Sequence, residues 1–137
     1  MIMKRLAAGC VVSGLMALAT PVFAQTYTVD VAAISAGCAG SAAACEAVVA
    51  VEVARLQAAG LTLEVINTQL GAIAGVAITA AASLPAVERA KLADMMRAIA
   101  AASTSPEQAR ALQTLASNLA SGADVNLVAV ASSLSAS

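Results

Sequence analysis

The chain has 137 residues, of which 61% are hydrophobic, 11% charged and 1% aromatic, with a formal net charge of −1 and no histidine. So few and scattered charges do not form the basic surface that nucleic acid or anionic lipid requires. The lack of histidine excludes the commonest general base, the Ser–His–Asp arrangement and the His-containing zinc sites.

The segment 1–24 has the pattern of a secretory signal peptide. Lys4 and Arg5 precede an uncharged apolar run, which ends before Pro21. Small residues then occupy the positions that a signal peptidase reads. We therefore expect cleavage between Ala24 and Gln25 and export of the protein to the periplasm or the medium.

Two other fates of this segment compete with cleavage. A retained membrane anchor is disfavoured because the apolar run is short for a bilayer span. The sequence LAAGC, ending at Cys10, is typical of a lipidation site, but it lies too close to Arg5 and the apolar run continues beyond it.

Cleavage after Ala24 would leave the segment 25–137, which is one domain in size. Lys4 and Arg5 would be removed, so the mature chain would be more acidic than the precursor.

An irregular or extended arm is expected over residues 25–40, because Thr26 to Val29 and Val31 favour extended backbone. From residue 41 onward alanine dominates, and alanine has the highest helix propensity of any residue. A first helix is expected from Ser41 to Ala59, ended by Gly60.

Three further helices are expected downstream. The second follows Thr62, a suitable N-cap, and runs to residue 82. The third opens at Ser83 and Pro85 and runs to residue 102. The fourth begins at Ser105, which forms a capping box with Gln108, and ends at residue 122. A short fifth helix is expected over residues 124–134.

Apolar residues recur at i, i+3, i+4 and i+7 in two of these helices, which predicts one buried face on each. The two sets are Leu92, Met95, Met96, Ile99 and Leu112, Leu115, Ala116, Leu119. Without histidine nearby, the adjacent methionines indicate core packing rather than a soft-metal site.

Cys38 and Cys45 are expected to form a structural disulfide, because an exported protein meets an oxidising compartment. On one continuous helix their Cα atoms would lie about 10.5 Å apart, too far for a bond. We therefore place Cys38 in a loop before the first helix, with Gly37 and Gly40 allowing the chain to fold back. A redox site would use closer spacing, and a metal site would need more ligands.

The second helix carries no charge from residue 65 onward, and Gly71 and Gly75 form a GxxxG step that permits close helix–helix contact. Its length would allow a membrane span. Asn67, Gln69 and Pro85 argue against one, so we interpret it as a central helix of the bundle.

No catalytic, cofactor-binding or metal-binding residue is predicted. Lys91 lies on a charged helix face, and no feature pairs it with a buried serine. Glu46 and Glu52 are six positions apart and point to different sides of a helix. Glu52 falls within an apolar face, where it is either a partly buried functional carboxylate or, as we prefer, a rim residue paired with Arg55.

The sequence therefore predicts an all-α protein, a small Ala-rich bundle of four to five helices with an irregular or extended N-terminal arm. Its expected parts are a signal peptide (1–24), the arm (25–40) and the bundle (41–137). We expect an exported, non-enzymatic structural or interaction protein that associates with itself or with another exported protein. The alternative is a binder of membrane surfaces or of apolar ligands, in a cavity lined by Ile66, Leu70, Ile73, Leu92, Met95 and Ile99.

Overall fold

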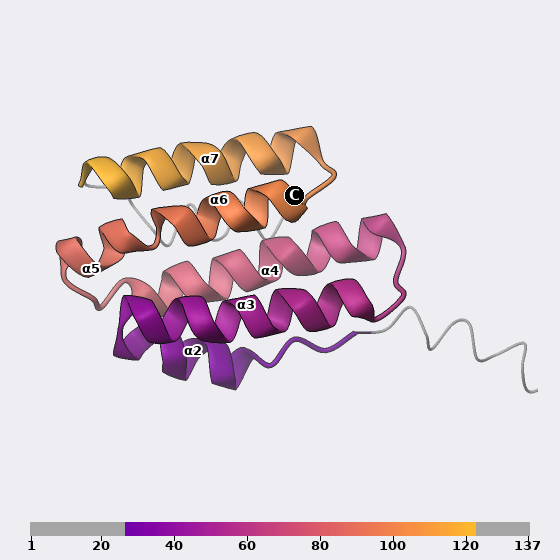
Figure 1. Cartoon of the computed structure of the whole chain (residues 1–137), viewed down its shortest axis with the longest axis horizontal. Helices are drawn as coiled ribbons and strands as arrows, with labels where there is room; N and C mark the ends of the chain where they lie inside the picture. Colours follow the sequence, from indigo (N-terminus) through magenta and orange to yellow (C-terminus); the bar gives the residue numbers. More distant parts are fainter. Residues whose placement is uncertain (1–26, 123–137) are drawn as a thin grey trace, which may run out of the picture.

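A computed structural model describes residues 27–122, which form helices and no strand (Figure 1). The helices are α2 (Val31–Gly40), α3 (Ala42–Ala58), α4 (Leu63–Ala81), α5 (Ala86–Lys91), α6 (Ala93–Ala102) and α7 (Pro106–Ser121). The chain reverses direction between α2, α3, α4, the α5–α6 pair and α7. The predicted all-α bundle is confirmed.

Most helices begin or end at the capping residues that the sequence predicts. The hydroxyls of Ser41, Thr62 and Ser105 accept the backbone N–H three residues ahead, at 3.1, 3.3 and 3.3 Å. Gly60 and Gly122 follow α3 and α7 with φ of +72°, a conformation that other residues adopt at a cost. Local chemistry is therefore enough to place these boundaries.

The N-terminal arm differs from the expectation. Among the described residues only 27–30 precede the first helix, and the expected arm from Val31 to Gly40 is helix α2. Asp30 caps this helix by accepting the N–H of Ala33 at 3.0 Å. The β-branched residues predicted extended backbone too far along the chain. The helix begins earlier because Asp30 is an N-cap and is followed by mostly small residues that favour a helix.

The expected third helix is divided in two. Its N-cap is Pro85, not Ser83, and no side chain caps it. The helix is interrupted at Leu92, which separates α5 from α6 and is itself fully buried. The break lets the chain bend while keeping Leu92 in the core.

Helix α4 lies at the centre of the bundle, where it contacts α2, α3 and α6. It is also the one helix in the described part of the chain that is long and apolar enough to cross a membrane, by length and composition. The two predicted apolar faces, on α6 and α7, are buried as expected, Met95 and Met96 included.

Polar side chains join distant parts of the bundle. Gln108, only 1% exposed, accepts a hydrogen bond from Ser103 Oγ at 2.6 Å and donates to the carbonyl of Asn67 at 2.9 Å. The backbone N–H of Thr104 donates to Asn67 Oδ1 at 2.9 Å. These bonds fasten the α6–α7 turn to α4, so the Gln108 side chain does not complete the capping box that the sequence suggested.

Several sequence predictions lie outside the described residues. They are the signal peptide with its cleavage site at Ala24 and Gln25, the alternative lipidation of Cys10, and the short helix over residues 124–134.

Candidate functional site

An open groove of about 520 Å³ runs between α3 and α6. It is lined by Glu46, Val49, Ala50, Val53, Ala54 and Gln57 of α3 and by Asp94, Met95, Ala98 and Ile99 of α6. From Glu46 to Gln57 the α3 positions extend about 16 Å along the helix axis. The groove is therefore about three helical turns long.

The groove has an apolar floor and low walls. Val49, Met95 and Ile99 form the floor and are each no more than 6% exposed. Ala50 and Ala54 are exposed beside them. Because an alanine side chain ends at Cβ, these positions carry no atoms that could fill the space between the two helices.

The two ends of the groove differ in charge. Glu46 and Asp94 are the first lining residues of helices that run in the same direction, so they lie at one end, with Gln57 at the other. Asp94 pairs with Arg97 at 2.8 Å. Glu46 is half-buried and forms no hydrogen bond or ion pair with any residue in the range 27–122. One end is thus acidic, with a carboxylate that has no partner among residues 27–122, and the other carries an amide.

The groove is not the cavity that the sequence suggested. Only Met95 and Ile99 belong to both sets. Leu70, Ile73 and Leu92 are fully buried, so they take part in the core rather than lining an open space. Residue spacing in the sequence predicts which face of a single helix is buried, but it does not predict where two neighbouring helices leave a space between them.

The exposed sides of α2 and α3 carry almost no charge. Helix α2 has no charged residue, and Arg55 is the one charged residue among the exposed positions of α3. The other exposed α3 positions are Ala43, Ala44, Ala47, Ala50, Val51, Ala54, Gln57 and Ala58. Helices α6 and α7 instead expose Asp94, Arg97 and Arg110. Alanines spaced three and four apart on α3 were the sequence signal for this surface.

Cys38 and Cys45 form a disulfide, as predicted, with 1.97 Å between the sulfurs and 4.0 Å between the Cα atoms. The expected loop position of Cys38 is wrong, since Cys38 lies in α2 and Cys45 in α3. The chain folds back at Ser41, whose backbone is extended with φ −168° and ψ 164°. The disulfide thus joins two helices and is fully buried.

Gly37 allows α2 to approach α3 closely. A Cβ atom there would lie 2.9 Å from Val48 Cγ1 and 3.2 Å from the carbonyl oxygen of Ala44. Gly40 has no such neighbour within 4 Å. Gly37 is therefore needed for packing, whereas the sequence suggested that both glycines supply flexibility.

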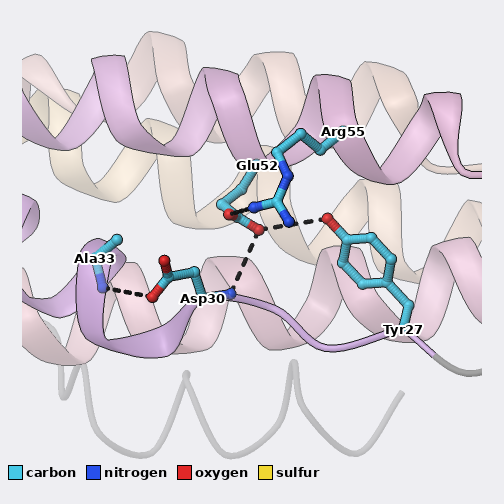
Figure 2. A network of polar contacts seen from close by, with 5 residues as sticks. All are labelled: Tyr27, Asp30, Ala33, Glu52 and Arg55. Atoms are coloured by element: carbon cyan, nitrogen blue, oxygen red, sulfur yellow. Dashed lines mark hydrogen bonds and ion pairs between the residues drawn. The ribbon is translucent and has the colours of Figure 1, made fainter.

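Glu52 joins the N-terminal segment to α3 (Figure 2). Its Oε2 atom accepts hydrogen bonds from the Tyr27 hydroxyl and the Asp30 backbone N–H, both at 3.4 Å, and its Oε1 atom pairs with Arg55. Burial raises the pKa of Tyr27, and the negative charge of Glu52 raises it further. The predicted pairing with Arg55 is confirmed. The predicted rim position is wrong, because residues 27–30 cover Glu52 and leave it 2% exposed.

The remaining candidates lie apart from the groove. Gly71 and Gly75 are buried in α4, so they face the interior of the protein rather than a partner. Lys91 is exposed and pairs with Glu88 at 2.8 Å, a hydrogen bond that raises the pKa of Lys91. Residues 27–122 contain no group of three or more Cys, Asp or Glu side chains that could hold a metal ion.

No protein-family model, curated protein or solved structure matches this chain. The groove between α3 and α6 is the feature whose geometry is suited to binding, and Glu52 and the disulfide fasten the elements around it.

Proposed function

We propose that this protein is an exported, non-enzymatic structural protein that binds protein helices, above all those of other copies of itself. The observation that carries the proposal is the groove between α3 and α6, which opens to the surface between exposed alanines above a largely buried apolar floor. Export is supported by the N-terminal sequence pattern and agrees with the disulfide.

The dimensions of the groove suit a helix. An amphipathic helix bound in an apolar groove inserts side chains at i, i+3, i+4 and i+7, a set that fits within three turns. Ala50, Ala54 and Ala98 permit close approach of its backbone, and the buried side chains beneath them supply apolar contact. Burying such a surface is favourable in water, at about 25 cal/mol per Å² of apolar area.

The distribution of charge also favours association. A soluble monomer usually carries charged residues at about 25–35% of its surface positions. The exposed side of α2 has none and that of α3 has only Arg55. Filling the groove and covering this surface would remove apolar area from water, so we expect self-association at moderate concentration.

Light scattering combined with sedimentation tests the proposal. The processed protein should have the mass of an oligomer, and Ala54→Glu should shift it to monomer, because a charge would enter the apolar groove. Ala111→Glu, at an exposed alanine of α7, is the matched control and should leave the mass unchanged. Circular dichroism checks that both variants fold. A wild-type protein that stays monomeric at all concentrations would contradict the proposal.

A second candidate function is binding of an apolar ligand such as an acyl chain. The groove volume of about 520 Å³ lies within the roughly 300–1,000 Å³ of small-molecule sites. Native mass spectrometry of protein purified from its producing cells would show a bound lipid as added mass, and the bare protein mass would count against this function. Flotation with liposomes tests membrane binding separately, and no binding at any lipid composition would remove it.

A further inference from the structure

One side of α4 is left partly uncovered by the other described helices, and the C-terminal segment of the chain has the length and pattern to cover it. We propose that residues 124–134 form a helix that packs antiparallel on this side of α4 in the same molecule. The segment 123–137 lies outside the described residues. The proposed contact is on a different surface from the α3–α6 groove and does not depend on self-association.

The uncovered side of α4 is apolar and uncharged. Residues three and four positions apart lie on one side of a helix. Five half-buried residues of α4 have this spacing and are called the α4 face: Val65, Gln69, Ala72, Val76 and Ala80. On the opposite side of the helix Leu70, Ala74 and Ile78 are fully buried, so α4 packs into the bundle through that side. No charged residue lies between Val65 and Leu84. A half-buried face of this kind is suited to packing against one further helix.

The C-terminal segment carries a matching apolar face. Leu127, Val130, Ala131 and Leu134 recur at i, i+3, i+4 and i+7. Asp124 precedes them and is suited to cap the start of a helix. The leucines would lie over the alanines of the α4 face, and close-packed interiors interdigitate in this way. The two surfaces therefore fit each other in polarity and in side-chain size.

The chain leaves α7 at a position that favours this contact. Helices α4 and α7 end at the same end of the bundle (Figure 1). Helix α5, which the short connection 82–85 joins to α4, contacts α7. Gly122 ends α7 with φ of +72°, which turns the chain out of the helix. A helix over residues 124–134 is about 16 Å long, so running back from this end it would cover α4 from Ala80 to about Gln69.

Charge favours the α4 face over the groove as the place for this segment. The segment starts at the end of the bundle where Glu46 and Asp94 lie, so in the groove Asp124 would be a third carboxylate beside them. Like charges in a contact are repulsive, whereas the α4 face has no charge. The proposed contact also covers the one helix in the described part of the chain that is long and apolar enough to cross a membrane.

Thiol labelling of the full chain tests whether the segment covers the α4 face. Ala72→Cys places a reporter in the middle of that face, in a chain carrying Cys10→Ser. The buried Cys38–Cys45 disulfide does not react with a maleimide. The rate of reaction at the reporter therefore measures how much of the α4 face is open to solvent.

Charges on the apolar face of the segment should uncover the reporter. Adding Leu127→Asp and Leu134→Asp should make Ala72→Cys react at least about tenfold faster, because carboxylates are strongly disfavoured in an apolar contact. The matched control is Ser132→Asp with Ser133→Asp, on the opposite side of the proposed helix, which should leave the rate unchanged. Circular dichroism checks that each chain keeps its helices. Equal rates in all three chains would overturn the inference.

Cross-linking gives a second measurement that introduces no charge. The reagent is a bismaleimide about as long as the spacing of packed helix axes, roughly 8–10 Å. It should join Ala72→Cys to Ala131→Cys within one molecule, because these positions lie at nearly the same level in the antiparallel arrangement. The control pair, Ala50→Cys in the groove with Ala131→Cys, should not be joined.

Each other result of the cross-linking overturns the inference. Joining of the control pair alone places the segment in the groove, and equal joining of both pairs indicates a segment without a fixed position. A covalent dimer shows that the segment covers α4 of a second copy. Neither measurement uses the mass of the untreated protein, so a failure here leaves the proposed function standing, and a monomeric mass in light scattering leaves this inference standing.

Discussion

Replacing Gly37 with alanine should destabilise the protein, although the same change strengthens most helices. Gly37 lies inside α2, where alanine is favoured by about 1 kcal/mol over glycine. In the folded structure, however, the new Cβ would lie 2.9 Å from Val48 Cγ1 and 3.2 Å from the carbonyl oxygen of Ala44. Both distances are shorter than ordinary van der Waals contact, so α2 and α3 would have to move apart.

The helices have little freedom to move apart. The carbonyl of Ala44 belongs to the backbone of α3, and Val48 is β-branched with a stiff χ1. The Cys38–Cys45 disulfide holds the two helices together beside the contact, with Cα atoms 4.0 Å apart. Overpacking of this kind costs about 1–3 kcal/mol, and the gain in helix propensity offsets only part of it. We expect a net loss of about 1–2 kcal/mol.

Thermal unfolding followed by circular dichroism measures the effect. For a domain of roughly 100 residues, the loss corresponds to a decrease in Tm of about 5–10 °C. Gly40→Ala is the matched control, because Gly40 is in the same helix and no atom lies within 4 Å of the position of its new Cβ. That variant should gain up to about 1 kcal/mol. If Gly37→Ala were as stable as the wild type, the close approach of α2 to α3 would be refuted.

Three further perturbations test the contacts around this region. Replacing Cys38 and Cys45 with alanine should cost about 2.5 kcal/mol, since the bond closes a loop of about eight residues; an unchanged midpoint in urea would contradict this. Glu52→Ala should lose about 1 kcal/mol because the partly buried hydroxyl of Tyr27 and N–H of Asp30 lose their acceptor. Hydrogen exchange should show faster opening of residues 27–40, and slow exchange would refute that role. The hydrogen bonds from Lys91 and from the N-terminal N–H of α3 lower the pKa of Glu88 in the folded state. Because the pKa of Glu88 is lower in the folded state, its ionised side chain stabilises the fold above the unfolded pKa of about 4.3, and this stabilisation is lost as the pH falls below that value. Glu88→Gln should therefore make the acid unfolding transition less steep, and identical acid transitions of the two proteins would contradict this role of Glu88.

The sequence predicts the structure correctly where a few neighbouring residues decide the outcome. Ser41, Thr62 and Ser105 cap helices through their own side chains, and the buried faces of α6 and α7 follow from residue spacing. The disulfide was predictable because only two cysteines follow the expected signal peptide. Asp30, in contrast, was a cap signal that the β-branched residues around it concealed.

What the sequence by itself determined is therefore the helical class, most helix boundaries and the face that each amphipathic helix buries, because these depend on interactions within one or two helical turns. The tertiary structure decided that Glu52 is buried, that Gln108 bonds to α4 rather than to its own helix end, and that a groove remains between α3 and α6. Each of these depends on which helices become neighbours. In a chain whose most common residue is alanine, helical periodicity marks the faces but gives little information on how they pair, so only the folded structure shows which space stays open.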